Sequence, residues 1–567
     1  MGFSTSKSAP EVNSVHPAHK AAEHKRHVRE SILSRYQHWR PDKTGDIPQD
    51  VSALVTAKLD DRERAIVSLD ATALLEHIRQ SAYSSVEVIT AYFKVAVAAQ
   101  DLTNCLTEIF FDLALERANE LDEYLRKEGR VVGPLHGLPV SIKDHILVKG
   151  FDTSSGYTAW AEKTVANKDA VVVDLLRRSG AILYVKTANP QTLLSLETEN
   201  NIFGRTVNPF NTKLSPGGSS GGEGALISSF GSPMGIGTDI GGSIRVPAAH
   251  CGLYGMKGSV ARMPHTGLMG SQDGMDNIIG VVGPLTRSAR DLALFARAML
   301  DAEAWTAEHQ VLEIPWKPDV VEGKTLPRRL SIAILADDGV VRPHPPLLRA
   351  LEKYRKALVA AGHEVIDWVP MRHQEAWDLI VKFYFLDGGE EYYETFREGG
   401  EEPIATVAWI LSHVKGRAPY TVRQTWKLNC ERENFRAAAL QHWNETKRRT
   451  ESGRPVDAIL TPAFATLAPP HDTTRWWGYS SYWNLVDYPG IVFPTGERLV
   501  VKDYPEGVEC LPPARNDVEE FIRSQWNPKT YENAPVSLQL VGRRHNEEKL
   551  LAILQKVEEA ASGTLPP

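Results

Sequence analysis

The sequence predicts an α/β protein with one large core and a helical extension at the N-terminus. Two observations carry this prediction. Helical patterns alternate with short apolar runs along much of the 567 residues, an order of elements typical of α/β folds. Strand-like runs also occur after residue 450. This favours a single core that spans residues 71–562 rather than several domains.

The extension, residues 1–70, contains a basic segment. Residues 16–40 carry six Lys and Arg side chains and two Glu side chains, so we expect a basic helix that faces solvent. His24 and His27 lie one helical turn apart, but they lack a third ligand, and no metal site or cofactor is predicted.

The first core elements are helices followed by a turn and a strand. Ser84 and Glu87 have the spacing of a capping box and open a helix that runs toward Gln100. A second helical stretch, LALERANELDEYLRKEG, ends near Gly129. Residues 133–144, GPLHGLPVSIKD, predict a turn punctuated by glycine and proline and then a short strand.

The alternation then repeats. Residues 169–187 predict a helix, a stop at Gly180 and a strand. A strand at 328–337 precedes a helix whose apolar face runs through 347–358, and Gly362 ends this helix. Further strands are expected at 363–369, 456–462, 490–496 and 535–542.

Composition excludes several classes of protein. The net charge of −7 disfavours a nucleic-acid partner, which calls for a basic balance. No run of 18 apolar residues predicts a transmembrane helix, and no apolar N-terminal region predicts a secretory signal. The four cysteines are scattered without a CxxC pair, which predicts reduced thiols in a cytoplasmic protein.

A glycine- and serine-rich stretch, SPGGSSGGEG, occupies residues 215–224. No charge follows from Gly224 to Thr238, which indicates burial rather than a flexible linker. A phosphate-binding loop would need a lysine after the glycines, and none is present. Gly218–Gly222 also fits the pattern Gly-x-Ser-x-Gly with Ser220 as nucleophile, although no clear strand precedes it.

A second loop follows at residues 240–243. Asp239 and Arg245 flank it, and charged residues in an apolar run must be paired or functional, so we expect them to brace the loop. The loop offers four successive backbone N–H groups beside the hydroxyl of Ser243. Amide hydrolysis needs such donors to hold an oxyanion, together with a nucleophile and a base.

These segments resemble the amidase signature family. The resemblance lies in GLPVSIKD at 137–144, GGSSGGEGALI at 217–227 and GTDIGGSIRVPAAHCGLYG at 237–255, with 24 residues between Ser219 and Ser243. It extends from about residue 70 to 560 and is strongest toward fungal acetamidases, with fatty acid amide hydrolases more distant. It implies an α/β/α core around a central mixed sheet.

The resemblance also implies the site residues. The family's nucleophile falls on Ser243, its bridging serine after a cis peptide bond on Ser219, and its basic lysine on Lys143. The oxyanion donors fall on the backbone of Ile240, Gly241, Gly242 and Ser243. By analogy with the fatty acid amide hydrolases, Leu193 would line the substrate site. Apart from the resemblance, we expect Ser220 to support the loop by hydrogen bonding, and Glu223 receives no role.

A lysine base requires a strongly lowered pKa. Free lysine has a pKa of ~10.4, so work near neutral pH needs a drop of ~3 units, on the order of 4 kcal/mol. Desolvation is the ordinary source of such a shift. Lys143 lies in the strand-like segment PVSIKDH, where burial is expected.

The expected function is cofactor-free hydrolysis of small aliphatic or aryl carboxamides to carboxylate and ammonia. Esters, carbamates and anilides suit the same triad. An elbow-type hydrolase using Ser220, or a subunit that transamidates charged tRNA, are the alternatives. The aromatic segment 475–487 predicts either core or a wall of the acyl pocket. Family members often form dimers, so the resemblance allows a homodimer.

Overall fold

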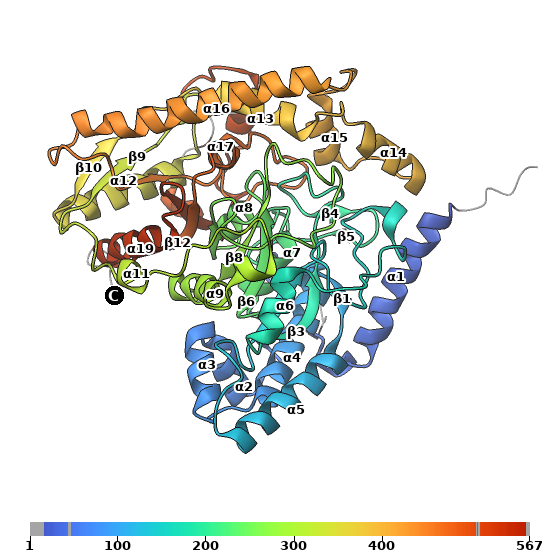
Figure 1. The fold of residues 1–567 in the computed structure, drawn as a ribbon. Coiled ribbons are helices and arrows are strands. Elements are labelled where there is room, and N and C mark those ends of the chain that lie inside the picture. Colours follow the sequence, from blue (N-terminus) through green and yellow to red (C-terminus); the bar gives the residue numbers. More distant parts are fainter. Residues whose placement is uncertain (1–15, 43–46, 506, 508–510, 563–567) are drawn as a thin grey trace, which may run out of the picture.

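A mixed sheet of 11 strands forms the centre of the molecule (Figure 1). The computed structural model describes residues 16–42, 47–505, 507 and 511–562. The strands, in sheet order, are β1 (Leu106–Ile109), β3 (Ile182–Thr187), β2 (Pro139–Lys143), β6 (Met234–Asp239), β8 (Val281–Thr286), β7 (Tyr254–Lys257), β12 (Gly490–Arg498), β13 (Pro535–Val541), β11 (Ala458–Thr461), β9 (Ser331–Ile334) and β10 (Glu364–Asp367). β2 is parallel to β3 and β6, β9 is parallel to β10 and β11, and the other neighbours are antiparallel. The predicted α/β class and mixed sheet are confirmed. A separate small hairpin joins β4 (Glu199–Asn200) to β5 (Gly204–Arg205).

Helices surround this sheet. In chain order they are α1 (Pro17–Ser34), α2 (Asp61–Ser68), α3 (Ala71–Arg79), α4 (Ser85–Thr103), α5 (Phe111–Glu128), α6 (Val171–Arg178), α7 (Gly221–Ser228), α8 (Arg245–His250), α9 (Ala289–Asp301), α10 (Ala304–Ala307), α11 (Pro318–Val321), α12 (Pro345–Ala360), α13 (His373–Tyr384), α14 (Glu390–Gly399), α15 (Ala405–Ser412), α16 (Val422–Glu445), α17 (Gly478–Leu485), α18 (Asp517–Ser524) and α19 (Glu547–Ser562). Helices α2 to α5 gather at one end of the molecule, and α13 to α16 lie toward the other (Figure 1). In the described part of the chain, no helix has the length and apolar character needed to cross a membrane.

Helices cover both faces of the sheet, as the alternation along β12 shows. Ile491 and Phe493 join the large core that includes residues of α9 and α19. Val492, between them, belongs to a smaller cluster with Ile244 and Ala248 at α8. Since successive strand residues point to opposite faces, α8 packs on one face while α9 and α19 pack on the other. The sheet is therefore buried on both faces, as the near-continuous apolar strands indicate.

The helices and strands predicted from the sequence are present. Ser84 and Glu87 form the capping box that opens α4, and Gly129 ends α5 in the left-handed conformation. Gly180 and Gly362 also have positive φ, and each lies two residues after the last residue of α6 or α12. Local turn and capping chemistry therefore decides where these elements begin and end.

Helix α1 corrects one expectation, because its basic face is not solvated. Lys25 is buried and forms ion pairs with Glu108 at 2.5 Å and with Asp152 at 2.7 Å. His24 contacts Glu162 on the surface. The expectation of a solvent-facing basic helix is therefore wrong for the side that carries Lys25, which attaches α1 to the core.

Candidate active site

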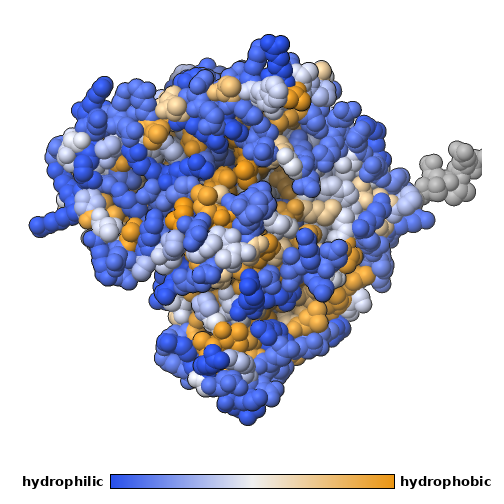
Figure 2. All heavy atoms as spheres, in the orientation of Figure 1, coloured by the Kyte–Doolittle hydropathy of each residue, from blue (hydrophilic) through white to orange (hydrophobic). Residues whose placement is uncertain are grey.

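A cavity of about 570 Å³ lies where β2 and β6 end, beneath residues 265–280. In this region Figure 2 shows the surface hollowed beside hydrophobic side chains. Ser219, Ser243 and Leu193 all line this cavity. Carboxyl ends of parallel strands commonly carry the functional groups of open α/β sheets, because loops converge there. The fold therefore gathers two of the serines singled out in the sequence, 24 residues apart, into one concave site.

Lys143, the last residue of β2, is fully buried beside this cavity. Its Nζ lies 2.6 Å from the Ser219 hydroxyl oxygen and 3.0 Å from that of Thr238. Burial lowers the pKa of Lys143 to about 7, although the carboxyl groups of Asp239 and Glu223 act in the opposite direction. A neutral amine is therefore accessible near physiological pH.

The two glycine loops are joined through their backbones. The peptide bond between Gly218 and Ser219 is cis. The N–H of Ser220 donates to the carbonyl oxygen of Ser243 at 3.1 Å. The hydroxyls of Ser219 and Ser243, both in the described part of the chain, face one cavity but share no hydrogen bond in this structure. Lys143, Ser219 and Ser243 thus lie together, with the Lys143–Ser219 contact formed.

The expectation of four free oxyanion donors needs one correction. The N–H of Gly242 already donates to Asp239 Oδ1 at 2.8 Å, because the carboxylate turns back over the loop. The N–H groups of Gly241 and Ser243 have no acceptor among the described residues. The carbonyl of Ile240, which lines the cavity, accepts a hydrogen bond from the Tyr384 hydroxyl at 2.8 Å.

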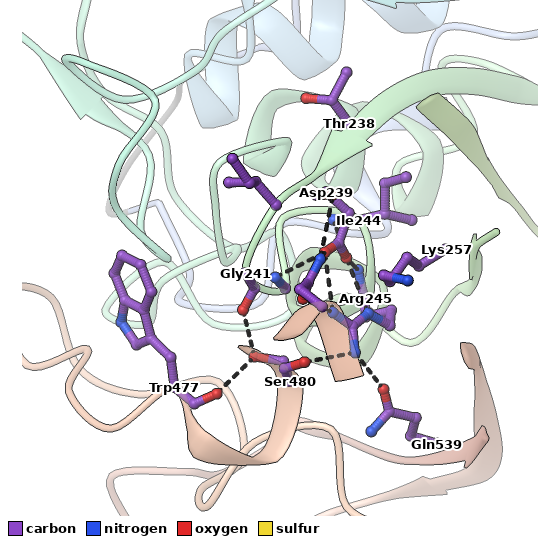
Figure 3. Close-up of polar contacts among 12 residues, drawn as sticks. Thr238, Asp239, Gly241, Ile244, Arg245, Lys257, Trp477, Ser480 and Gln539 are labelled. Atoms are coloured by element: carbon purple, nitrogen blue, oxygen red, sulfur yellow. Dashed lines mark hydrogen bonds and ion pairs between the residues drawn. The ribbon is translucent and has the colours of Figure 1, made fainter. Parts of the chain in front are cut away.

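Asp239 and Arg245 form the expected ion pair (Figure 3). Both side chains are fully buried, and Arg245 Nη2 lies 2.9 Å from Asp239 Oδ1 while Nε lies 3.0 Å from Oδ2. Burial alone would raise the pKa of Asp239, but the Arg245 guanidinium holds it well below its usual range. Arg245 also donates to the carbonyl of Ser480 and to Gln539 Oε1, so the pair anchors the loop to distant parts of the core.

The remaining predicted residues divide into two groups. Leu193 lines the cavity with a φ of +66°, whereas Ser220 is absent from its lining. The Ser220 hydroxyl instead lies 3.4 Å from the backbone N–H of Thr238. The geometry therefore gives Ser220 a loop-supporting contact and no exposure to the cavity.

The aromatic segment 475–487 fills the core. Trp477, Tyr479 and Trp483 are buried in a cluster with α13 and α16, and they do not line the cavity. Of the two interpretations of this segment, the structure supports the core position and not the wall of the acyl pocket. The aromatic lining comes from Tyr384 of α13 and from Tyr392 of α14.

Sequence reasoning also missed groups around Lys143. Glu223 is fully buried and accepts hydrogen bonds from the hydroxyls of Ser141 on β2 and Thr187 on β3. Burial raises its pKa to about 8. Alternation along β2 could have placed Ser141 on the same face as Lys143, because the two residues are two positions apart, but it gives no sign of Glu223 on α7. The described residues contain no cluster of three or more His, Cys, Asp and Glu that could hold a metal ion.

Comparison with known proteins identifies the class. The family model described as Amidase matches residues 87–551. The chain is 39% identical over 513 residues to an acetamidase of Emericella nidulans, covering 90% of this chain and 92% of that protein. It is also 39% identical to an acetamidase of Aspergillus oryzae, covering 87% and 90% of the two chains. The solved structure of a fatty acid amide hydrolase matches with a TM-score of 0.87 and 32% identity, covering 96% and 95%.

The fold and these relatives define a hydrolase that acts on carbon–nitrogen bonds. The chain belongs to the amidase signature family, and it is an amidase.

Proposed function

We propose that the protein is a serine amidohydrolase that converts small aliphatic or aryl carboxamides to a carboxylate and ammonia through Ser243, Ser219 and Lys143. The observation that carries the proposal is the buried contact between Lys143 and Ser219 in the wall of a cavity that also exposes Ser243. A serine hydroxyl needs a base to attack an amide at neutral pH, and a desolvated lysine can act as that base.

The chemistry follows from these positions. Neutral Lys143 accepts the proton of Ser219 while Ser219 takes the proton of Ser243. Ser243 Oγ then bonds to the amide carbon, and the backbone N–H groups of Gly241 and Ser243 stabilise the oxyanion. The proton returns through Ser219 to the leaving nitrogen, which departs as ammonia. Water then hydrolyses the acyl-enzyme by the same relay. The missing Ser219–Ser243 hydrogen bond would form when substrate closes the site, because catalytic contacts often tighten only in the complex.

The cavity supports acyl groups larger than acetyl. Its volume of about 570 Å³ falls within the ~300–1,000 Å³ range of small-molecule sites. Leu193, Met269 and Tyr384 give it apolar walls that suit an aliphatic chain or an aromatic ring. Carbamates, anilides and esters place the same carbonyl against Ser243 and belong in the same substrate panel.

The test is ammonia release from acetamide, longer aliphatic amides and benzamide, with kcat/KM determined for each. Ser243→Ala should lower kcat by about 10³-fold or more, as removal of a catalytic serine does elsewhere. Ser220→Ala is the matched control, since Ser220 is buried in the neighbouring loop but does not reach the cavity. A fluorophosphonate should label Ser243. Full activity of Ser243→Ala, or labelling that maps to Ser220, would overturn the proposal.

A further inference from the structure

His145 lies two residues after Lys143 and belongs to the same cavity wall. Its ring is almost fully buried and contacts two groups. Nδ1 lies 3.2 Å from the carbonyl oxygen of Met269, and Nε2 lies 2.7 Å from the hydroxyl oxygen of Thr238. Thr238 Oγ1 in turn lies 3.0 Å from Lys143 Nζ. A chain of hydrogen bonds therefore runs from the loop over the cavity to the catalytic amine.

The direction of each hydrogen bond in this chain is fixed by chemistry. A carbonyl oxygen can only accept, so the proton on the His145 ring lies on Nδ1 and points to Met269. Burial, with Lys143 and Lys186 nearby, holds the pKa of His145 well below its usual range, so the ring is neutral and Nε2 is an acceptor. The Thr238 hydroxyl must then donate to Nε2. Its oxygen remains to accept an N–H of Lys143.

This arrangement has a consequence for the base. A neutral lysine has two N–H donors and one lone pair. One N–H is directed to Thr238, and Ser219 lies 2.6 Å away, where its hydroxyl can donate to the lone pair. If the Thr238 hydroxyl lost its acceptor on His145, it could turn its proton toward Nζ and compete with Ser219 for that lone pair.

We propose that His145 is a positioning residue that, through the Thr238 hydroxyl, keeps the lone pair of Lys143 available to Ser219. This inference rests on the proposed function and adds to it a residue outside the Ser–Ser–Lys set. His145 acts through Thr238 and Lys143 and takes no part in bond making.

The test is a double-mutant cycle on the full chain with His145→Leu and Thr238→Val, assayed with an amide that the wild type hydrolyses. His145→Leu should lower kcat by about 10-fold or more, the effect of one misdirected hydrogen bond at a buried group, and leave KM within about threefold. In the Thr238→Val background no hydroxyl competes for the lone pair, so the same substitution should change kcat by less than about threefold. His145→Gln, which can accept from Thr238, should restore kcat toward the wild-type value.

If His145 only packed against the loop, the result would differ. His145→Leu would then lower kcat by the same factor in the wild-type and the Thr238→Val backgrounds. Equal losses in both backgrounds, or unchanged kcat in His145→Leu, would overturn the inference. His145→Phe, which keeps a planar aromatic ring without an acceptor nitrogen, replaces His145→Leu in the cycle if the leucine variant does not fold. Ser243→Ala is measured alongside, so that a failed nucleophile assignment is distinguished from a failed role for His145.

Discussion

Lys143 and Ser219 are 76 residues apart in the chain, and the fold brings Nζ of the lysine to 2.6 Å from the serine hydroxyl. Lys143 ends β2, while Ser219 precedes α7, which packs on β2 and β6. Both side chains are buried against the cavity wall. A buried ammonium lacks the hydration that stabilises its charge, so the burial of Lys143 favours the neutral amine that a proton relay requires.

The pKa of Lys143 predicts the pH dependence of the reaction. Since burial places it at about 7, kcat/KM should rise with pH and level off above that value. Below this pKa, each decrease of one pH unit lowers the fraction of neutral amine about tenfold. Lys143→Arg should be inactive at every pH in this range, because a guanidinium stays charged. The measurement is kcat/KM for amide hydrolysis from about pH 5 to about pH 9. A flat wild-type profile would contradict the assignment of Lys143 as the base.

Glu223 predicts a pH-dependent difference in stability. Burial raises its pKa from 4.5 to about 8, so between these values the folded state keeps a proton that the unfolded state has released. Its contribution is therefore fully present below pH 4.5 and is lost as pH rises through about 8. Glu223→Gln does not titrate, so the free energy of unfolding of the variant should improve relative to wild type as pH rises across this window. Urea unfolding at several pH values measures the difference.

Comparing Glu223→Gln with Glu223→Leu measures the contribution of the hydrogen bonds that Glu223 accepts from Ser141 and Thr187. Gln keeps an acceptor oxygen for Ser141 or Thr187, whereas Leu leaves both hydroxyls without the carboxyl partner they have now. We expect Leu to cost about 1–3 kcal/mol for the buried Thr187 hydroxyl, because the Ser141 hydroxyl keeps a hydrogen bond to Ser232 at 3.0 Å. A difference between Gln and wild type that stays constant with pH would show that Glu223 has the same pKa in the folded and the unfolded state.

The Asp239–Arg245 pair predicts a large loss when one partner is removed. Arg245→Met leaves the Asp239 carboxylate buried without its counter-ion, which should cost about 3–5 kcal/mol of folding free energy. Asp239→Asn in the same chain should recover part of this loss, because the double variant buries no lone charge. Denaturant unfolding of the two single variants and the double variant gives the coupling. Additive losses would mean that the two side chains stabilise the loop independently.

Much of the fold could be predicted because its signals are local. The strands at β9, β11 and β13 are short apolar runs bounded by turn residues, and the helices next to them have clear caps and stops. β6 was not predicted, since its sequence MGIGTD alternates glycine with other residues. A Cβ at Gly235 would overlap Glu223 Oε2, and one at Gly237 would lie 2.8 Å from Ser220 Oγ. These glycines leave room for the Glu223 and Ser220 side chains to pack against β6, and local propensity does not reveal such a tertiary contact.

The same distinction holds for the site. Lys143, Ser219 and Ser243 lie in segments whose glycines and spacing could be matched to a known family. Tyr384 lies on α13 within an ordinary helical pattern, and its contact with Ile240 depends on a packing between elements 144 residues apart. His145 ends the quoted segment PVSIKDH, but its role depends on the position of Thr238 on β6. Contacts of this kind follow from the assembled sheet and not from any single stretch of sequence.

Lys25 predicts how strongly α1 is held on the core. It is the shared counter-ion of Glu108 and Asp152. Burial alone would lower its pKa, but these two carboxylates hold the pKa above the usual range. Lys25→Met keeps the aliphatic chain but leaves the buried Asp152 carboxylate and the partly buried Glu108 carboxylate without their shared counter-ion, which should cost about 3–5 kcal/mol or release the helix. Arg35→Met is the matched control on the same chain segment, because Arg35 pairs with Asp112 on the surface and should cost less than about 1 kcal/mol. Urea unfolding and limited proteolysis within residues 17–34 measure both effects. Equal stability of the two variants would show that the buried ion pairs do not hold α1 in place.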